Sequence, residues 1–121
     1  RPVISSSGLF TPAETITNEE LVGSFNAYVE RYNAEHAAEI ARGELEPLQP
    51  SSVEFIEKAS GIKSRHVMAK APVLDPAIMA PRWDERGNDE LSIMAEIGVK
   101  AARQALERAG RDPADVDAVL C

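Results

Sequence analysis

Residues 51–68 read SSVEFIEKASGIKSRHVM, and this stretch predicts a short helix followed by an extended segment. Ser51 and Glu54 have the spacing of a capping box, in which the serine hydroxyl and the glutamate carboxylate bind free N–H groups at a helix start. Gly61 is a typical stop, because glycine readily adopts the left-handed conformation that ends many helices. Residues 62–68 then have an extended pattern. The stretch therefore predicts a helix-to-strand connection with a glycine at the turn.

A longer amphipathic helix is predicted upstream of this connection. Thr17 and Glu20 form a second capping-box pattern, and Gly43 is the expected stop. Residues 2–8 read as a short strand, and the two prolines after Gly43 mark a linker. Apolar or aromatic side chains and one histidine recur with helical spacing: Leu21, Phe25, Tyr28, Val29, Tyr32, His36 and Ile40.

Downstream, residues 71–87 are predicted to be a long loop with one helical turn around Pro76. A loop of this length in a compact domain is usually functional or an interface. Asn88 is the expected cap of a third helix that ends at Gly110, and its many alanines allow other backbones to approach on more than one face. Residues 118–121 are expected to be a buried strand. The order of strands and helices predicts an α/β layered fold.

The composition is that of an acidic globular protein. The 121 residues include 13 Lys and Arg against 20 Asp and Glu, a net charge of −7, which argues against nucleic-acid or anionic-membrane binding. No apolar run approaches the roughly 20 residues that cross a bilayer. The single cysteine, Cys121, cannot form an intramolecular disulfide, which favours a reducing, cytoplasmic setting. Neither histidine has partners at metal-ligand spacing, so no metal site is predicted.

One stretch of this acidic chain is basic. Residues 51–71 have two interpretations, a site for an anionic group such as phosphate and an ordinary solvated face. The basic side chains concerned are Lys58, Lys63, Arg65 and Lys70, against Glu54 and Glu57.

The same stretch resembles a segment near the start of the β-ketoacyl-acyl-carrier-protein synthases III. Residues 55–66, FIEKASGIKSRH, are similar to the family pattern W-I-x-x-R-T-G-I-x-x-R. The flanks agree with it. Residues 4–12 are similar to the opening strand and G-x-x-x-P turn, and residues 17–21 to the helix start T-N-x-x-L. Residues 101–120 are similar to A-x-x-A-L-x-x-A-G-x-x-x-x-x-I-D-x-x-I, so motifs match in order over nearly the whole chain.

The resemblance implies a thiolase-like fold, in which two α/β halves form five αβαβα layers and two copies form a homodimer. The chain is then expected to be the incomplete front part of the N-terminal half. The implied activity is that of an acyltransferase of fatty-acid synthesis, which condenses acyl-CoA with malonyl-acyl-carrier protein through a cysteine acyl-enzyme. By the family pattern the catalytic cysteine, histidine and asparagine lie beyond Cys121. No catalytic residue and no cofactor other than the acyl-CoA substrate are therefore expected here, and Cys121 is expected to be a buried structural thiol.

The resemblance also implies how coenzyme A is held. In the family the tryptophan of the motif stacks on the adenine, and the arginine contacts the nucleotide phosphates. Here Phe55 takes the tryptophan position and Ala59 the arginine position, which removes that contact. Lys58 and Lys63 could replace it, and Arg65 completes the expected coenzyme-binding set. Core packing is the other interpretation of Phe55.

Two departures from the family pattern are similar to synthases that accept medium-chain acyl-CoA. Residues 25–50 are longer than in ordinary synthases III, and residues 71–87 are inserted. Ile78, Met79 and Trp83 could line an acyl path, cover a neighbouring subunit, or pin the loop to its own core.

Two further hypotheses stay open on the sequence. One is a hydroxymethylglutaryl-CoA synthase-like enzyme, which shares the fold and uses acyl-CoA. The other is a non-catalytic acidic α/β module that binds a partner protein through its first helix and proline-rich loop.

Overall fold

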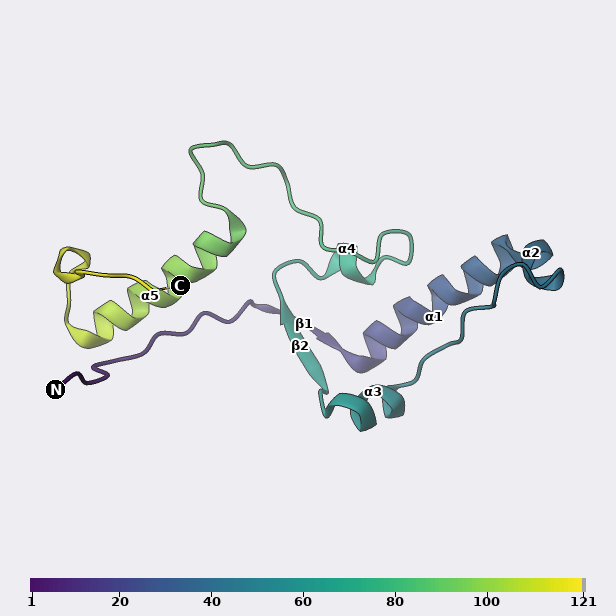
Figure 1. Cartoon of the computed structure of the whole chain (residues 1–121), viewed down its shortest axis with the longest axis horizontal. Helices are drawn as coiled ribbons and strands as arrows, with labels where there is room; N and C mark the ends of the chain where they lie inside the picture. Colours follow the sequence, from purple (N-terminus) through teal and green to yellow (C-terminus); the bar gives the residue numbers. More distant parts are fainter. Residues whose placement is uncertain (121) are drawn as a thin grey trace. The chain divides into compact units, whose positions relative to one another are not determined.

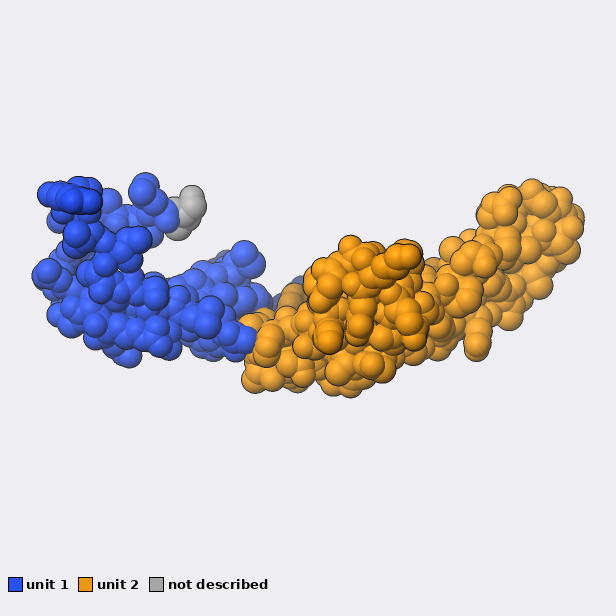
Figure 2. Space-filling model, turned by 90° about the horizontal axis from the view of Figure 1, so that it is seen from below, with its two compact units in different colours: residues 1–11, 84–121 blue, residues 12–83 orange. Residues whose placement is uncertain are grey.

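A computed structural model describes residues 1–120 of the chain, and Cys121, with its predicted burial, lies outside the described residues. The elements are β1 (Glu14–Thr17), α1 (Asn18–Glu35), α2 (Ala37–Ala41), α3 (Val53–Ser60), β2 (Ser64–Val67), α4 (Ala71–Leu74), α5 (Ile93–Ala109) and the 3₁₀ turn η1 (Pro113–Asp115) (Figure 1). They form two compact units, which Figure 2 colours separately. We call residues 12–83 the α1 unit, and residues 1–11 with 84–120 the α5 unit. This mixture of helices and strands is consistent with a segment of an α/β protein.

The α1 unit contains a two-stranded antiparallel sheet. Ile16 lies opposite Arg65, and Thr17 lies opposite Ser64. Strand β2 confirms the extended segment predicted over residues 62–68. Strand β1 is missed by the sequence prediction, although three of its four residues are β-branched, because it runs directly into the capping box that dominates the local pattern.

Helix α1 begins as predicted and ends earlier. Thr17 Oγ1 accepts the Glu20 N–H at 3.2 Å, and Glu20 Oε2 accepts the Thr17 N–H at 2.9 Å, which confirms the capping box. The single helix predicted up to Gly43 is wrong. At His36 the backbone leaves the helical region, with φ −105° and ψ 19°, and the short helix α2 follows. The apolar periodicity continues across this break, so the sequence pattern could not reveal it.

Helix α3 begins one residue later than the capping-box pattern indicates. The hydroxyl of Ser52, not of Ser51, accepts the Phe55 N–H, at 3.1 Å. Ser51 belongs to the preceding linker because its own backbone is bound to the side chain of Asn26. The helix ends at Gly61, whose φ of +70° confirms the predicted stop.

The insertion contains the expected turn around Pro76, where the N–H groups of Ile78 and Met79 donate to the Asp75 carbonyl at 3.0 and 2.9 Å. The short helix α4, which the sequence did not predict, precedes this turn. Pro72 is the second residue of α4, where the missing N–H of proline does no harm. The hydroxyl of Ser24 on α1 donates a hydrogen bond to the Leu74 carbonyl at 2.7 Å. Arg31, also on α1, donates to the Pro76 carbonyl at 3.0 Å. Helix α1 therefore holds the start of the insertion.

Helix α5 is capped by Ser92, whose hydroxyl accepts the Ala95 N–H at 3.1 Å. The predicted cap, Asn88, is wrong because residues 87–90 form their own turn. In that turn the Glu90 N–H donates to the Gly87 carbonyl at 3.0 Å. The stop at Gly110 is confirmed, with φ +62°. The turn η1 begins after Asp112, whose carboxylate accepts the Ala114 N–H at 2.9 Å, and Pro113 is its first residue.

The two predicted terminal strands do not form within residues 1–120. Residues 2–8 lie against α5, where Ser6 Oγ donates to the Ala105 carbonyl at 2.6 Å, so their partner is a helix and not a strand. Residues 118–120 have no strand partner among the described residues, and a strand requires one. A Cβ atom on Gly8 would lie 1.9 Å from the Ala101 carbonyl oxygen, so glycine alone fits this close approach.

The buried side chains of residues 1–120 all belong to the α1 unit. They are the apolar Ile16 and Val29 and the polar Asn18 and Ser24. No side chain of α5 is buried by the described residues, although its sequence predicts a helix covered on several faces. No helix within residues 1–120 has the length and apolar character needed to cross a membrane.

Candidate functional site

The predicted site residues lie along one connection in the α1 unit, from α3 through the Gly61 turn to β2. Phe55 stands in the first turn of α3 with 67% of its surface exposed. Lys58 follows three residues later on the same helix face, and Lys63 lies just before β2, and both are exposed. Arg65 lies within β2 and is only half-buried. In this unit Phe55 is therefore not a core residue.

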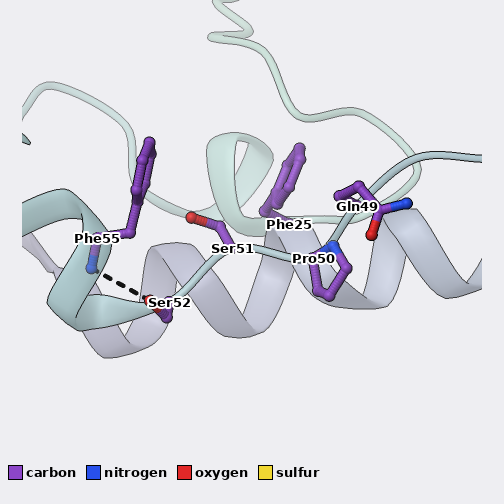
Figure 3. Close-up of a pocket in the computed structure, with 6 residues that line it drawn as sticks. All are labelled: Phe25, Gln49, Pro50, Ser51, Ser52 and Phe55. Carbon is purple, nitrogen blue, oxygen red and sulfur yellow. Dashed lines mark hydrogen bonds between the residues drawn. The ribbon is translucent and has the colours of Figure 1, made fainter.

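Phe55 borders an open groove of about 640 Å³. The other residues of its wall come from α1 and from the linker before α3: Phe25, Gln49, Pro50, Ser51 and Ser52. Figure 3 shows the Phe25 and Phe55 rings on the same side of the linker, with Ser51 between them. A flat aromatic group could therefore enter beside either ring.

A smaller apolar hollow of about 250 Å³ adjoins the groove and shares Phe25 and Ser51 with it. Its remaining wall consists of Leu21, Val22, Ile56 and Met79. Met79 comes from the insertion and has a φ of +46°, a conformation that is rare outside glycine. Ile78 and Trp83, the other two insertion residues singled out by the sequence, are 38% and 47% exposed and do not line this hollow.

Two asparagines on α1 hold the linker that forms the groove wall. Asn26 Nδ2 donates to the Ser51 carbonyl at 3.0 Å, and its Oδ1 accepts the Ser51 N–H at 2.8 Å. Asn33 binds both backbone groups of Leu48 in the same way, each at 2.9 Å. Sequence reasoning missed both residues. Two asparagines seven residues apart on one helix face, followed by a proline-containing linker, are the signal that could have found them.

Arg65 supports the turn between α3 and β2. Its Nη2 donates to Asn18 Oδ1 at 3.1 Å, and Asn18 Nδ2 donates to the Ile62 carbonyl at 2.7 Å. Asn18 is only 1% exposed, so this chain of hydrogen bonds is internal. Arg65 Nη1 is buried and has no hydrogen-bond partner within residues 1–120. The guanidinium is therefore better placed to position the turn than to meet a ligand from solvent.

The basic stretch is partly neutralised by its own unit. Lys70 forms an ion pair with Glu20 of α1. The hydrogen bond from Lys70, together with the N–H of Thr17, holds the pKa of the Glu20 carboxyl below its ordinary value. Lys58 and Lys63 form no ion pair with the described residues. They are the two cations of this stretch that are exposed and available to an anion.

The described residues contain no cluster of three or more His, Cys, Asp or Glu side chains that could hold a metal ion. The candidate site combines an exposed aromatic ring, two exposed lysines and an adjacent apolar hollow. Such a combination suits a ligand that has a flat ring, negative charge and an apolar part.

Comparison with known proteins gives two curated relatives and no matching family model. A beta-ketodecanoyl-acyl-carrier-protein synthase of Pseudomonas aeruginosa is 60% identical over 97 residues, which cover 80% of this chain and 28% of that protein. A beta-ketoacyl-acyl-carrier-protein synthase III of Sulfurovum sp. is 33% identical over 82 residues, which cover 68% of this chain and 18% of that protein. The matched part of the chain therefore covers less than a third of the length of either relative.

Proposed function

We propose, since this chain belongs to the β-ketoacyl-acyl-carrier-protein synthase III family, that the whole protein is a condensing enzyme of fatty-acid synthesis. A cysteine thiolate takes the acyl group from acyl-CoA and releases coenzyme A. Malonyl-acyl-carrier protein then loses CO₂, and the resulting carbanion attacks the acyl-enzyme. The products are a β-ketoacyl-acyl-carrier protein and the free thiolate. The 60% identity to one relative over 97 residues carries this proposal.

The acyl donor proposed is a medium-chain acyl-CoA. The relative from Pseudomonas aeruginosa is named for a β-ketodecanoyl product. Malonyl supplies two carbons of such a product after decarboxylation, which leaves an octanoyl group as the donor. The longer residues 25–50 and the inserted residues 71–87 are the two departures from the family pattern that resemble such enzymes.

The coenzyme site proposed is the connection from α3 to β2. The exposed Phe55 ring supports stacking on adenine, because a ring that is 67% exposed has a free face. Lys58 and Lys63 are proposed to meet the nucleotide phosphates. Arg65 also belongs to the expected set. It is proposed to act through Asn18 by fixing the turn between α3 and β2, which separates Lys58 from Lys63.

The experiment that tests the activity uses the full-length protein with malonyl-acyl-carrier protein. Octanoyl-CoA is expected to give β-ketodecanoyl-acyl-carrier protein, detected by mass, faster than acetyl-CoA gives the corresponding four-carbon product. Absence of condensation with every acyl-CoA would overturn the proposal. Condensation of acetyl-CoA with acetoacetyl-CoA, without release of CO₂, would instead identify a hydroxymethylglutaryl-CoA synthase.

The experiment that tests the coenzyme site compares two octanoyl donors in the Phe55→Ala variant. Stacking predicts that KM for octanoyl-CoA rises about ten-fold while kcat changes little, since one stacked base is worth roughly 1–3 kcal/mol. Octanoyl-pantetheine, which has no adenine, should show no comparable rise. Phe10→Ala, a matched change in the α5 unit, should alter neither KM. Equal losses with both donors would mean that Phe55 supports packing.

The proposal also places the nucleophile outside this segment, as the family pattern implies. Cys121→Ala in the full-length protein should therefore leave condensing activity largely intact. Loss of acyl transfer in a correctly folded variant would show that Cys121 is the nucleophile. A homodimer and a cytoplasmic location complete the proposal, and the mass of the purified enzyme by light scattering tests the first of these.

A further inference from the structure

We propose that Asn26 is a positioning residue for the coenzyme groove, acting through the backbone of Ser51. This inference rests on the proposed function, because it assigns a role in acyl-CoA binding to a side chain that touches no ligand itself. Asn26 is hydrogen-bonded to Ser51, and Asn33, seven residues later on the same helix, forms an equivalent pair with Leu48.

The linker between α2 and α3 has no secondary structure of its own and contains two prolines, which donate no backbone hydrogen bond. The Asn26 side chain pairs with the Ser51 N–H and carbonyl at 2.8 and 3.0 Å, as a neighbouring strand would. Asn33 does the same for Leu48, with both distances 2.9 Å. The linker is therefore bound along α1 at two points.

The spacing of these two points makes them a matched set. Seven residues of α-helix rise about 10 Å, and three residues of extended chain span about the same length. The pair Asn33–Leu48 and the pair Asn26–Ser51 have these separations, so an extended linker returning along α1 satisfies both without strain. Each pair anchors one end of the segment that contains Gln49 and Pro50.

The two ends of the segment differ in what surrounds them. Ser51 lines both the 640 Å³ groove and the 250 Å³ apolar hollow, whereas Leu48 lines neither. Figure 3 places Ser51 between the Phe25 and Phe55 rings. Ser51 also precedes Ser52, whose hydroxyl caps the helix that presents Phe55. Loss of the Asn26 pair would therefore free the wall of the groove and the residue before the Phe55 helix.

The test uses the full-length enzyme and octanoyl-CoA, with Asn33→Ala as the matched control for Asn26→Ala. Each variant loses two hydrogen bonds to the linker backbone, so both should lower the unfolding midpoint to a similar extent. Asn26→Ala should raise KM for octanoyl-CoA about five-fold with a much smaller change in kcat. Asn33→Ala should leave KM within about two-fold of the wild type.

A conservative variant separates positioning from a loss of packing. Asn26→Gln keeps both amide groups on a longer stem and should recover part of the KM loss. Hydrogen exchange should be faster at the Ser51 amide in Asn26→Ala, and at the Leu48 amide in Asn33→Ala. If Asn26→Ala does not yield folded enzyme, Asn26→Gln carries the test, with an expected KM between wild type and Phe55→Ala.

The outcomes distinguish this inference from the proposed function. A wild-type enzyme without condensing activity would overturn the proposed function. A Phe55→Ala variant with unchanged KM would overturn the proposed coenzyme site alone. An active wild type in which Asn26→Ala and Asn33→Ala change KM equally would overturn only the positioning role of Asn26. An unchanged KM in Asn26→Ala with faster exchange at Ser51 would overturn it as well.

Discussion

Different kinds of contact hold the segments together inside the α1 unit and inside the α5 unit. In the α1 unit, side-chain amides reach across the chain to backbone groups, as Asn18 does to Ile62 and Asn26 does to Ser51. In the α5 unit, the N-terminal segment lies so close to the helix backbone that Gly8 has no room for a side chain. Side-chain hydrogen bonds join segments in both units, as Ser6 does with Ala105 in the α5 unit, but only the α5 unit also requires a residue without a side chain at a close backbone contact.

This difference teaches which substitutions each unit tolerates. A buried amide that loses its partner leaves a polar group without water, which costs about 1–3 kcal/mol. A close backbone approach fails when any atom is added, and backbone atoms cannot swing aside as flexible side chains do. The α5 unit should therefore be most sensitive to added volume, and the α1 unit to removed polar groups.

The largest expected effect is at Gly8. Gly8→Ala places a Cβ at 1.9 Å from the Ala101 carbonyl oxygen and 2.7 Å from the Ala105 nitrogen, so the N-terminal segment must leave α5. We expect the free energy of unfolding to fall by about 3 kcal/mol, measured by urea denaturation of the full-length protein.

Gly98→Ala is the matched control within α5. An added Cβ there meets no atom of residues 1–120 within 4 Å, so alanine should be neutral or raise stability by up to about 1 kcal/mol through its better helix propensity. If Gly8→Ala and Gly98→Ala changed the free energy of unfolding equally, the close approach at Gly8 would not be what holds this unit together.

The next largest effect is expected at Asn18, which tests the other side of the comparison. Asn18→Ala removes the partner of the Ile62 carbonyl and of the Arg65 guanidinium inside the α1 unit. The free energy of unfolding should fall by about 2 kcal/mol. Asn88→Ala, at the position that the sequence suggested as a helix cap, should stay within about 0.5 kcal/mol of the wild type. A larger loss at Asn88 would restore that cap.

Local signals in the sequence predicted several individual boundaries in both units. The Thr17 capping box follows from side chains that bind backbone groups a few residues away, and the stops at Gly61 and Gly110 follow from the positive φ that glycine allows. A competing local bond accounts for the error at Asn88. The turn over residues 87–90 displaced the helix start from Asn88 to Ser92.

Long-range contacts explain what the sequence could not predict. The Asn26 and Asn33 pairs join residues that are 25 and 15 positions apart, and the seven-residue spacing of the asparagines does not identify which linker residues they bind. Motif order did indicate that Phe55 stands on a short helix before a glycine turn. The groove beside it depends on where the linker returns along α1, which periodicity does not encode.

A smaller effect is expected at the start of α3, where structure and sequence pattern disagree by one residue. Ser52→Ala removes the hydroxyl that accepts the Phe55 N–H and should lower the free energy of unfolding by about 1 kcal/mol. Ser51→Ala should lower it by less, because the Asn26 pair involves only the Ser51 backbone. A larger loss for Ser51→Ala than for Ser52→Ala, measured by urea denaturation, would identify Ser51 as the N-cap residue.

The smallest effects concern one carboxylate in each unit. The hydrogen bond from Lys70, then that from the Thr17 N–H, hold the pKa of Glu20 below its ordinary value, while Lys100 and then Arg86 do the same for the pKa of Glu96. Because the pKa is lowered in the folded state, each ionised carboxylate stabilises the fold fully at pH values above its ordinary pKa of 4.5. That contribution is lost as pH falls through the folded value. Both side chains are exposed enough for salt to screen them.

Glu20→Gln and Glu96→Gln test this in parallel, because glutamine removes the charge and still permits the capping-box bond of Glu20. The stability difference between wild type and each variant should shrink as pH is lowered from about 6 to about 3. Glu96 has two cationic partners, whereas Glu20 has one cation and a neutral N–H. Added salt should therefore reduce the Glu96 difference more than the Glu20 difference. A stability difference that grows as the pH is lowered would contradict the assignment of these partners, because protonation removes the charge through which they stabilise the fold.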